Sequence, residues 1–212
     1  MSAEIEREHA AFKKLTVTDS ASAVKVAGAA MMYVASGNER VSDVQLMLQL
    51  FFCRHVDNFQ IFLEETLRAI YSTQPGLLKR SEQVTVAQVL SHQSMEAFIA
   101  ELVENRIHKL AYKSIRDLAS YIKEDVKFDL FADRRTTDTV ELAFDVRNLV
   151  THNYGIVNKI FLSKHPDMGL ALDQPFPVWP ERIADEVKTL VAATSDIEKR
   201  ARSKFKLYIA GA

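Results

Sequence analysis

A single uninterrupted helical pattern over residues 42–72 limits the fold of this chain more than any other feature. Its apolar residues recur at the three- and four-residue spacing of an α-helix, and further apolar positions widen the stripe beyond one narrow face. A helix that is apolar over so much of its girth is expected at the centre of a core. The stripe contains Val44, Leu48, Phe51, Phe52, Phe59, Phe62, Leu63 and Ile70, widened by Leu46, Leu50 and Val56.

Two other side chains fall within this stretch. Cys53 is the only cysteine of the chain, which excludes an internal disulfide framework and a zinc site built from cysteines. We expect Cys53 to be a small buried hydrophobe in a reducing compartment. We expect His55, which falls on the same stripe, to be a hydrogen-bonded histidine of the core.

The rest of the sequence also predicts helices, which makes the expected fold class all-α. The chain has only six glycines and five prolines among 212 residues, and a break falls at Pro75 and Gly76. Residues 85–90 fit either a helix or a strand, and residues 127–138 predict a polar loop after which Thr137 or Asp138 caps a helix. Residues 169–180 hold three of the five prolines and predict an extended arm with room for a short strand. Further helices are predicted over residues 2–14, 19–36, 94–113, 114–122 and 181–208.

The charge balance bears on the class of partner. The formal net charge is -1, so binding to a nucleic acid requires a local basic patch. Two candidate patches could follow the phosphates of an RNA, and a solvated helix face is the alternative for each. One patch lies near the start of the helix after the polar loop and the other in the last predicted helix: Arg134 and Arg135, and Lys199, Arg200, Arg202 and Lys204.

The N-terminal sequence bears on localisation. Residues 1–14 are polar and lack the basic-then-apolar order of a signal peptide. The most apolar early stretch, residues 26–35, is about half as long as a membrane span. We therefore expect a cytoplasmic protein that has no membrane partner.

The helix after the polar loop carries a polar motif, DVRNLVTHNYGIVN, over residues 145–158. On a helical wheel one arc is apolar and a second arc forms a polar ridge. The apolar arc contains Leu142, Val146, Leu149 and Val150, and the ridge contains Glu141, Asp145, Asn148 and His152. Arg147 lies on a third arc. Gly155 is placed to end the helix in the left-handed conformation, so His152 falls in the last turn, where a helix favours a cation.

This stretch resembles a known signature. RNLVTHNYGIVN resembles the R-x(4–6)-H motif of the HEPN superfamily, in the form with four residues between Arg147 and His152, and Asn148 is the polar residue that usually follows the arginine. Residues 55–79 are similar to the long helix that precedes the motif helix in bacterial HEPN groups of the RiboL-PSP type, although Gln60 stands where those helices often carry an acid. The resemblance covers residues 42–163.

The resemblance implies an all-α, HEPN-like helical bundle of four to five main helices with extra N- and C-terminal helices. We expect one domain over residues 1–212, with its core at 42–163, a helical extension at 1–41, and a proline-containing arm and C-terminal helix at 164–212. It also implies a homodimer that acts as a metal-independent endoribonuclease in a toxin or phage-defence setting. An antitoxin or a defence-system protein is then a candidate partner.

The implied reaction uses the 2′-OH of RNA as nucleophile and yields a 2′,3′-cyclic phosphate and a 5′-OH. His152 suits the proton transfers, and Arg147 suits a bidentate grip on the phosphate. Asn148 could hold the imidazole or the phosphate, and Asn153 and Asp145 are supporting candidates. Two copies about a two-fold axis would supply two histidines, one to accept a proton and one to donate it.

Other enzyme classes lack their signatures in this sequence. It contains no Gly-rich phosphate loop, no HExxH pair, no calcium-loop array of acids and no nucleophile elbow. We therefore expect neither a cofactor nor a metal. The alternative function is a non-catalytic HEPN-like module that binds a nucleotide or RNA, or pairs with another protein.

Overall fold

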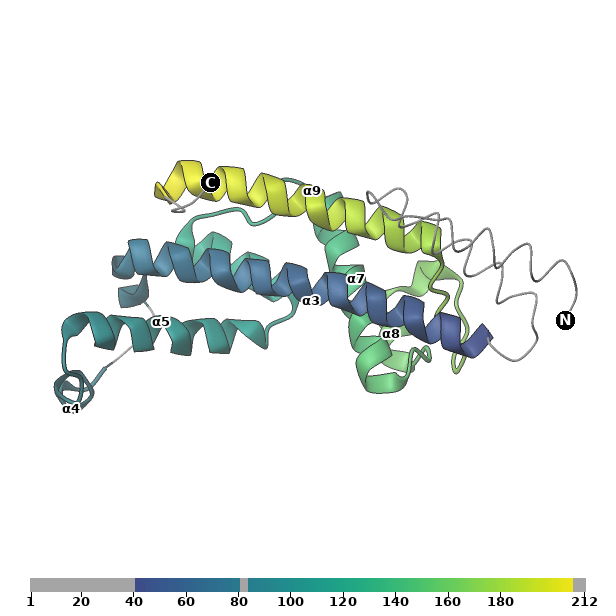
Figure 1. Cartoon of the computed structure of the whole chain (residues 1–212), viewed down its shortest axis with the longest axis horizontal. Helices are drawn as coiled ribbons and strands as arrows, with labels where there is room; N and C mark the ends of the chain where they lie inside the picture. The colour runs from purple at the N-terminus through teal and green to yellow at the C-terminus, as the bar shows by residue number, and fades with distance from the viewer. Residues whose placement is uncertain (1–40, 81–83, 208–212) are drawn as a thin grey trace, which may run out of the picture. The chain divides into compact units, whose positions relative to one another are not determined.

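The computed structural model describes residues 41–80 and 84–207, most of which are helical (Figure 1). The all-α prediction is confirmed, because the β structure within these residues is one isolated bridge between Ile156 and Pro175. The helices predicted over residues 2–14 and 19–36 lie outside the described residues. The α-helices are α3 (Val41–Thr73), α4 (Val86–Leu90), α5 (Met95–Ala111), α6 (Ile115–Tyr121), α7 (Arg134–Asn153), α8 (Lys159–Lys164) and α9 (Pro180–Phe205).

The described chain divides into two compact units. The motif unit contains residues 41–55 and 145–188, and the second unit contains residues 56–80, 84–144 and 189–207. All three boundaries between the units fall inside helices, since α3, α7 and α9 each contribute residues to both units. The single domain expected over residues 1–212 stays a prediction.

Helices from distant parts of the sequence form the core of the second unit. α3, α5, α6, α7 and α9 each turn an apolar face inward, and burying one large aliphatic or aromatic side chain stabilises a fold by about 1.5–3 kcal/mol. Short connections and long amphipathic helices are typical of a helical bundle. The buried residues include Phe59, Leu63, Leu67, Ile70, Tyr71, Val103, Ile107, Leu110, Ile115, Leu118, Val140, Ala143, Ile197, Ala201 and Phe205.

α3 confirms the helix predicted over residues 42–72, and Cys53 is buried within it as predicted. The prediction for His55 is wrong, because its side chain is exposed. Val56 belongs to the buried stripe, and the residue before it points about 100° away from that stripe. The same geometry leaves Phe51, which precedes the buried Phe52, 58% exposed.

Three short-range caps set the starts of the helices after the break at Pro75. Residues 85–90, which fitted either a helix or a strand, form α4 because Thr85 and Gln88 make a reciprocal capping box. The hydroxyl of Ser94 accepts from the backbone N–H of Ala97 at 3.2 Å and begins α5. Ser114 begins α6 in the same way.

The start of α7 corrects the predicted loop over residues 127–138. The helix begins at Arg134, so neither Thr137 nor Asp138 is its cap. The carboxylate of Asp133 accepts from the backbone N–H of Thr136 at 2.8 Å and from its hydroxyl at 2.9 Å. These bonds satisfy an otherwise unpaired N–H of the first turn and lower the pKa of the Asp133 carboxyl. Arg134 and Arg135 therefore lie in the first turn of the helix.

In the motif unit, the proline-containing arm pairs with the segment that follows α7. The backbone N–H of Val157 donates to Gln174 at 2.8 Å, and the N–H of Phe176 donates to Gly155 at 2.7 Å. This pairing is the isolated bridge between Ile156 and Pro175, the short extended element for which the prolines left room. The buried side chains of the unit include Val146, Leu149, Val157, Phe161, Phe176 and Val178.

The C-terminal helix predicted over residues 181–208 is α9, which begins and ends slightly earlier, at Pro180 and Phe205. A proline is well tolerated in the first turn, where its missing N–H would have no helical partner. Among residues 41–80 and 84–207, no helix has the length and apolar character needed to cross a membrane.

Candidate active site

The last turns of α7 separate a buried apolar face from an exposed polar face. Val146 and Leu149 are buried, whereas Asn148 and His152 are exposed. Asn148 and His152 are one helical turn apart, so their side chains lie on the same face. The predicted polar ridge is thus present at these two positions. The buried residues set the rotation of the helix, and this fixes the direction in which the two polar side chains leave it.

Arg147 joins this group by reaching around the helix. Its side chain is half-buried, and its Nη1 donates to Oδ1 of Asn148 at 3.1 Å. The helical wheel separates the two residues by about 100°, but the arginine stem is long enough to cover that arc. The end of α7 therefore brings a guanidinium and an amide together, with an imidazole one turn further along the same face as the amide.

The turn after α7 uses Asn153 and Gly155. The side-chain amide of Asn153 donates to the carbonyl of Ile156 at 2.5 Å, and the N–H of Gly155 donates to the carbonyl of Leu149 at 3.1 Å. Gly155 has a φ of 73°, which confirms the predicted left-handed stop. Asn153 thus stabilises the turn, and its supporting part in catalysis stays a prediction.

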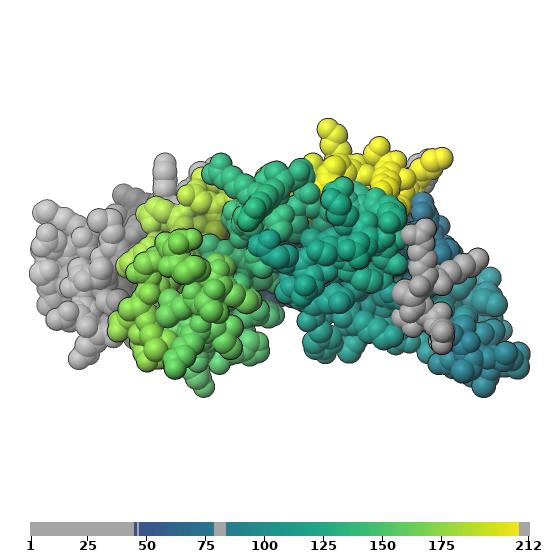
Figure 2. Space-filling view, turned by 180° about the vertical axis from the view of Figure 1, so that it is seen from behind, coloured from purple at the N-terminus to yellow at the C-terminus, as the bar shows by residue number. Residues whose placement is uncertain are grey.

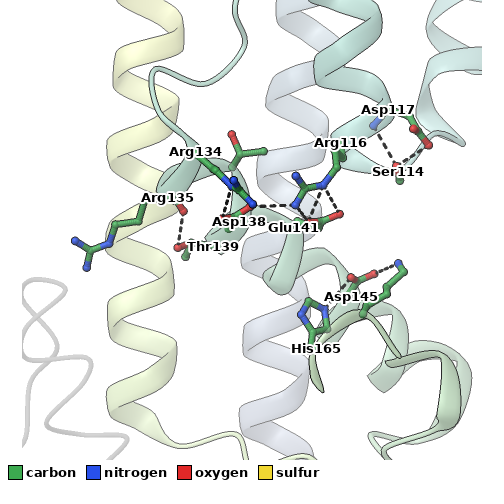
Figure 3. Close-up of polar contacts among 12 residues, drawn as sticks. Ser114, Arg116, Asp117, Arg134, Arg135, Asp138, Thr139, Glu141, Asp145 and His165 are labelled. Carbon is green, nitrogen blue, oxygen red and sulfur yellow. Dashed lines mark hydrogen bonds and ion pairs between the residues drawn. The ribbon is translucent and has the colours of Figure 1, made fainter. Parts of the chain in front are cut away.

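Asp145 connects α7 to α8. Its Oδ1 lies 2.6 Å from Nζ of Lys164 and its Oδ2 lies 3.0 Å from Nε2 of His165. Figure 3 shows the carboxylate facing the imidazole. The side chains of Asp145 and His165 are only 12% and 14% exposed, and the imidazole also packs on the ring of Phe161. The structure thus places Asp145 in an ion-pair cluster, and its predicted supporting role would be positional.

The first predicted basic patch lies on the first turn of α7, in the second unit. The side chain of Arg134 is 89% exposed, with Nε 3.6 Å from the Asp138 carboxylate. Arg135 is exposed as well. Asp138 also pairs with Arg116 of α6, whose guanidinium bonds to Glu141 as well (Figure 3). Glu141, which the wheel placed on the polar ridge, is therefore part of a link between α6 and α7.

The second predicted basic patch, near the end of α9, is largely engaged with the fold. Nη2 of Arg200 donates to the carbonyl of Leu130 at 2.9 Å, and its guanidinium lies 5.0 Å from the ring centre of Phe128. Lys204 donates to the carbonyl of Lys127. Arg202 pairs with Glu198 at 2.6 Å, and Lys199 is exposed.

A metal centre and an apolar hollow are the other kinds of site to consider in the described residues. In the part of the chain that the structure describes, no group of three or more His, Cys, Asp or Glu side chains is placed to hold a metal ion. A shallow hollow in the second unit has mostly apolar walls, and none of the residues predicted for the site is among them. Its walls include Leu63, Leu67, Ile107, Leu110, Ile115 and Phe144, with Gln60, Glu64 and Lys113.

Sequence reasoning missed two features of this region. Lys164 and His165 were not expected at the motif helix, because nothing local indicates which carboxylate a distant cation will meet. Tyr154 was passed over, although its position between the last turn and the helix-ending Gly155 was a readable signal. It has a φ of 55° and is 92% exposed.

No protein-family model, curated protein or solved structure significantly matches this chain. Its function must therefore be inferred from its own residues.

Proposed function

We propose that the protein is a metal-independent endoribonuclease of the HEPN type, with its site at the C-terminal end of α7. The observation that carries this proposal is that Arg147 is hydrogen-bonded to the exposed Asn148, and that His152 is exposed one helical turn further along the face of Asn148. The four-residue interval between Arg147 and His152 is the HEPN spacing, and the all-α architecture agrees with a HEPN-like bundle.

The proposed reaction needs two proton transfers. The imidazole of one His152 accepts the proton of the 2′-OH, and the 2′-oxygen then bonds to phosphorus. The bond from phosphorus to the 5′-oxygen breaks, and that oxygen takes a proton from a second imidazole. The products are a 2′,3′-cyclic phosphate and a 5′-OH. A positioned general acid or base typically contributes about 10²–10⁴-fold in rate.

The other two residues act on the phosphate. As the 2′-oxygen attacks, negative charge grows on the non-bridging oxygens, and the planar guanidinium of Arg147 can hold two of them at once. Its bond to Asn148 orients the guanidinium before the substrate binds. Stabilisation of charge by preorganised donors is usually the largest single contribution to catalysis.

The second imidazole comes from a second copy of the chain. One motif helix supplies one His152, so a homodimer with two α7 ends about its two-fold axis provides both an acceptor and a donor of protons.

The exposed Arg134, Arg135 and Lys199 are proposed to contact RNA phosphates outside the site. Smaller parts are proposed for Arg200, Arg202 and Lys204, whose side chains already have partners. A cytoplasmic location and an antitoxin or defence-system partner belong to the same proposal.

The test is cleavage of a labelled single-stranded RNA in excess EDTA by the wild type, His152→Ala and Arg147→Ala. His108→Ala is the matched control, because His108 is also an exposed histidine in the last turn of a helix, α5. We expect cleavage by the wild type and the control, with products that carry a cyclic phosphate. We expect the His152 and Arg147 variants to be slower by about 10²-fold or more.

Cleavage that survives in both motif variants would reject the assignment of these residues. Absence of cleavage in the wild type, with RNA still bound, would favour the non-catalytic binding module. Sedimentation of the wild type at several concentrations tests the homodimer separately.

A further inference from the structure

Tyr154 occupies a backbone conformation that large side chains seldom adopt. Its φ of 55° lies in the left-handed region, where a bulky residue is a strained outlier. Its side chain is nevertheless 92% exposed, so packing against the described residues does not compensate for the strain. The segment that follows α7, green in Figure 2, lies on the surface in that view. Such strain is often retained where a side chain has a task.

The residues on either side hold Tyr154 in this conformation. Asn153 is tied to the carbonyl of Ile156, and the N–H of Gly155 is tied to the carbonyl of Leu149. The Gly155 carbonyl also accepts from Phe176 at 2.7 Å. A Cβ on Gly155 would lie 2.5 Å from Nε2 of Gln49, so the backbone of the turn fits closely against α3. The turn is therefore fixed on both sides of a projecting aromatic ring.

A second exposed tyrosine shows why exposure alone is not the signal. Tyr112 is 79% exposed, but it follows α5 with an ordinary φ of -89° and its ring packs on His108 with centres 5.1 Å apart. Tyr112 has the conformation expected at a helix end. Tyr154 combines near-complete exposure with a left-handed backbone, two residues after His152.

We propose that Tyr154 is a stacking platform for an RNA base next to the phosphate that His152 addresses. This inference rests on the proposed ribonuclease function. Single-stranded RNA exposes the faces of its bases, and proteins bind those faces with aromatic rings that project from a rigid element. Because every base has such a face, Tyr154 positions the strand without selecting its sequence. It acts on binding, and the proton transfers remain with His152.

The test measures affinity separately from cleavage. In a His152→Ala background, the binding of a fluorescently labelled, single-stranded RNA about ten nucleotides long is followed by anisotropy, a length within the usual range of single-strand sites. Tyr154→Ala is expected to weaken binding by about 5- to 100-fold, whereas Tyr154→Phe keeps the ring and the affinity. Tyr112→Ala is the matched control and is expected to bind like the background.

Two further readouts separate stacking from a structural role. With oligonucleotides that each lack one base, the loss caused by Tyr154→Ala should disappear when the missing base is the stacked one. Tyr154→Asn, which tolerates the left-handed region, should weaken binding without lowering the thermal midpoint. A purely structural tyrosine would instead lower that midpoint when replaced.

The inference is overturned if Tyr154→Ala binds as tightly as the background, if the background binds no RNA, or if no missing base removes the loss. The binding test of Tyr154 can succeed or fail independently of the cleavage test of the proposed function. RNA that is bound through Tyr154 but never cleaved by the wild type would reject the nuclease while retaining the platform.

Discussion

The ends of α7 and α9 carry similar cationic side chains, but the fold uses them differently. At the end of α7, Asn148 and His152 are exposed, and Arg147 bonds to an amide that is itself exposed. Near the end of α9, the donors of Arg200 and Lys204 reach backbone carbonyls of the loop before α7. An arginine or lysine that bonds to backbone carbonyls of its own chain contributes to stability, whereas a side chain that faces solvent, as His152 does, remains accessible to an anion.

The loop before α7 explains why α9 is used in this way. A short π-helical turn, Ile122–Val126, ends at Lys127 with a left-handed φ of 57°, and the chain then runs without regular structure to Asp133. Carbonyl groups at such a helix end lack helical partners and need donors from elsewhere. A basic run in the sequence therefore predicts an RNA-binding surface only once it is known which of its side chains donate hydrogen bonds to nearby unpaired carbonyls.

The most demanding test of this difference replaces an arginine by lysine in each of the two regions, a change that preserves the charge. Lysine keeps the charge but loses the planar fork. We expect Arg147→Lys to lower the rate of RNA cleavage by about 10²–10³-fold, because lysine cannot hold two phosphate oxygens at once. We expect Arg200→Lys to cleave normally but to lose about 1–2 kcal/mol of unfolding free energy, a value reduced because the side chain is 30% exposed.

A reversed pattern, with Arg200→Lys defective in cleavage and as stable as the wild type, would show that the guanidinium of Arg200 serves the substrate and not the fold. Lys199→Ala is the control for α9. Because Lys199 is exposed on the same stretch, its replacement should change stability by less than about 0.5 kcal/mol.

The next largest effect is expected at the turn that presents the α7 site. Gly155→Ala forces a side chain into the left-handed region and places its Cβ 2.5 Å from the buried Gln49 side chain. We expect a loss of about 2–3 kcal/mol in unfolding free energy, measured by urea denaturation. Gly169→Ala is the matched control, since Gly169 also has a positive φ, 65°, but no atom within 4 Å of an added Cβ.

Gly169→Ala should therefore lower the free energy of unfolding only by the strain of a side chain at positive φ, about 1 kcal/mol. Equal losses in the two variants would contradict the close fit of the turn against Gln49. Adding Gln49→Ala to Gly155→Ala should recover part of the difference.

The smallest effect is expected at the other end of α9, where the fold uses an acid. Glu186 is 7% exposed, and burial raises its carboxyl pKa despite the bond to Arg182 at 3.0 Å. The folded state then holds the proton on Glu186 more firmly than the unfolded state does. The resulting contribution to the free energy of unfolding is complete below the unfolded pKa and is lost as pH rises through the folded pKa. Glu186→Gln should gain stability over the wild type at neutral pH and lose that advantage below about pH 4.

Urea denaturation of Glu186→Gln at a series of pH values measures this difference. Glu181→Gln is the control, because Glu181 is an exposed acid in the first turn of the same helix. A constant difference between Glu186→Gln and the wild type across pH would mean that the buried carboxyl keeps its ordinary pKa.

Much of the fold could be predicted from local sequence patterns. The helix over residues 42–72, the C-terminal helix and the left-handed Gly155 follow from periodicity and from one glycine after a helical run. The errors arose where two local signals competed. Asp133, and neither Thr137 nor Asp138, caps α7. His55 lies next to the buried stripe of α3 but is exposed.

The candidate site was predictable in its composition but only partly in its partners. Spacing on one helix placed Asn148 and His152 on one face, because rotation per residue is a local property. The length of the arginine stem, which allows Arg147 to reach Asn148, was also local. The interaction between Asp145 and His165 could not be predicted locally, since the two residues are 20 positions apart along the chain.

By itself the sequence determined the helices, the end of α7 and the identity of the polar groups presented there, because each depends on neighbours within a few residues. Only the tertiary structure decided which charged side chains bond to the chain's own backbone. Arg200 meets a carbonyl 70 residues away, and Lys204 meets one 77 residues away. Such pairings depend on how separate helices pack, and that packing is set by the whole core rather than by any one segment.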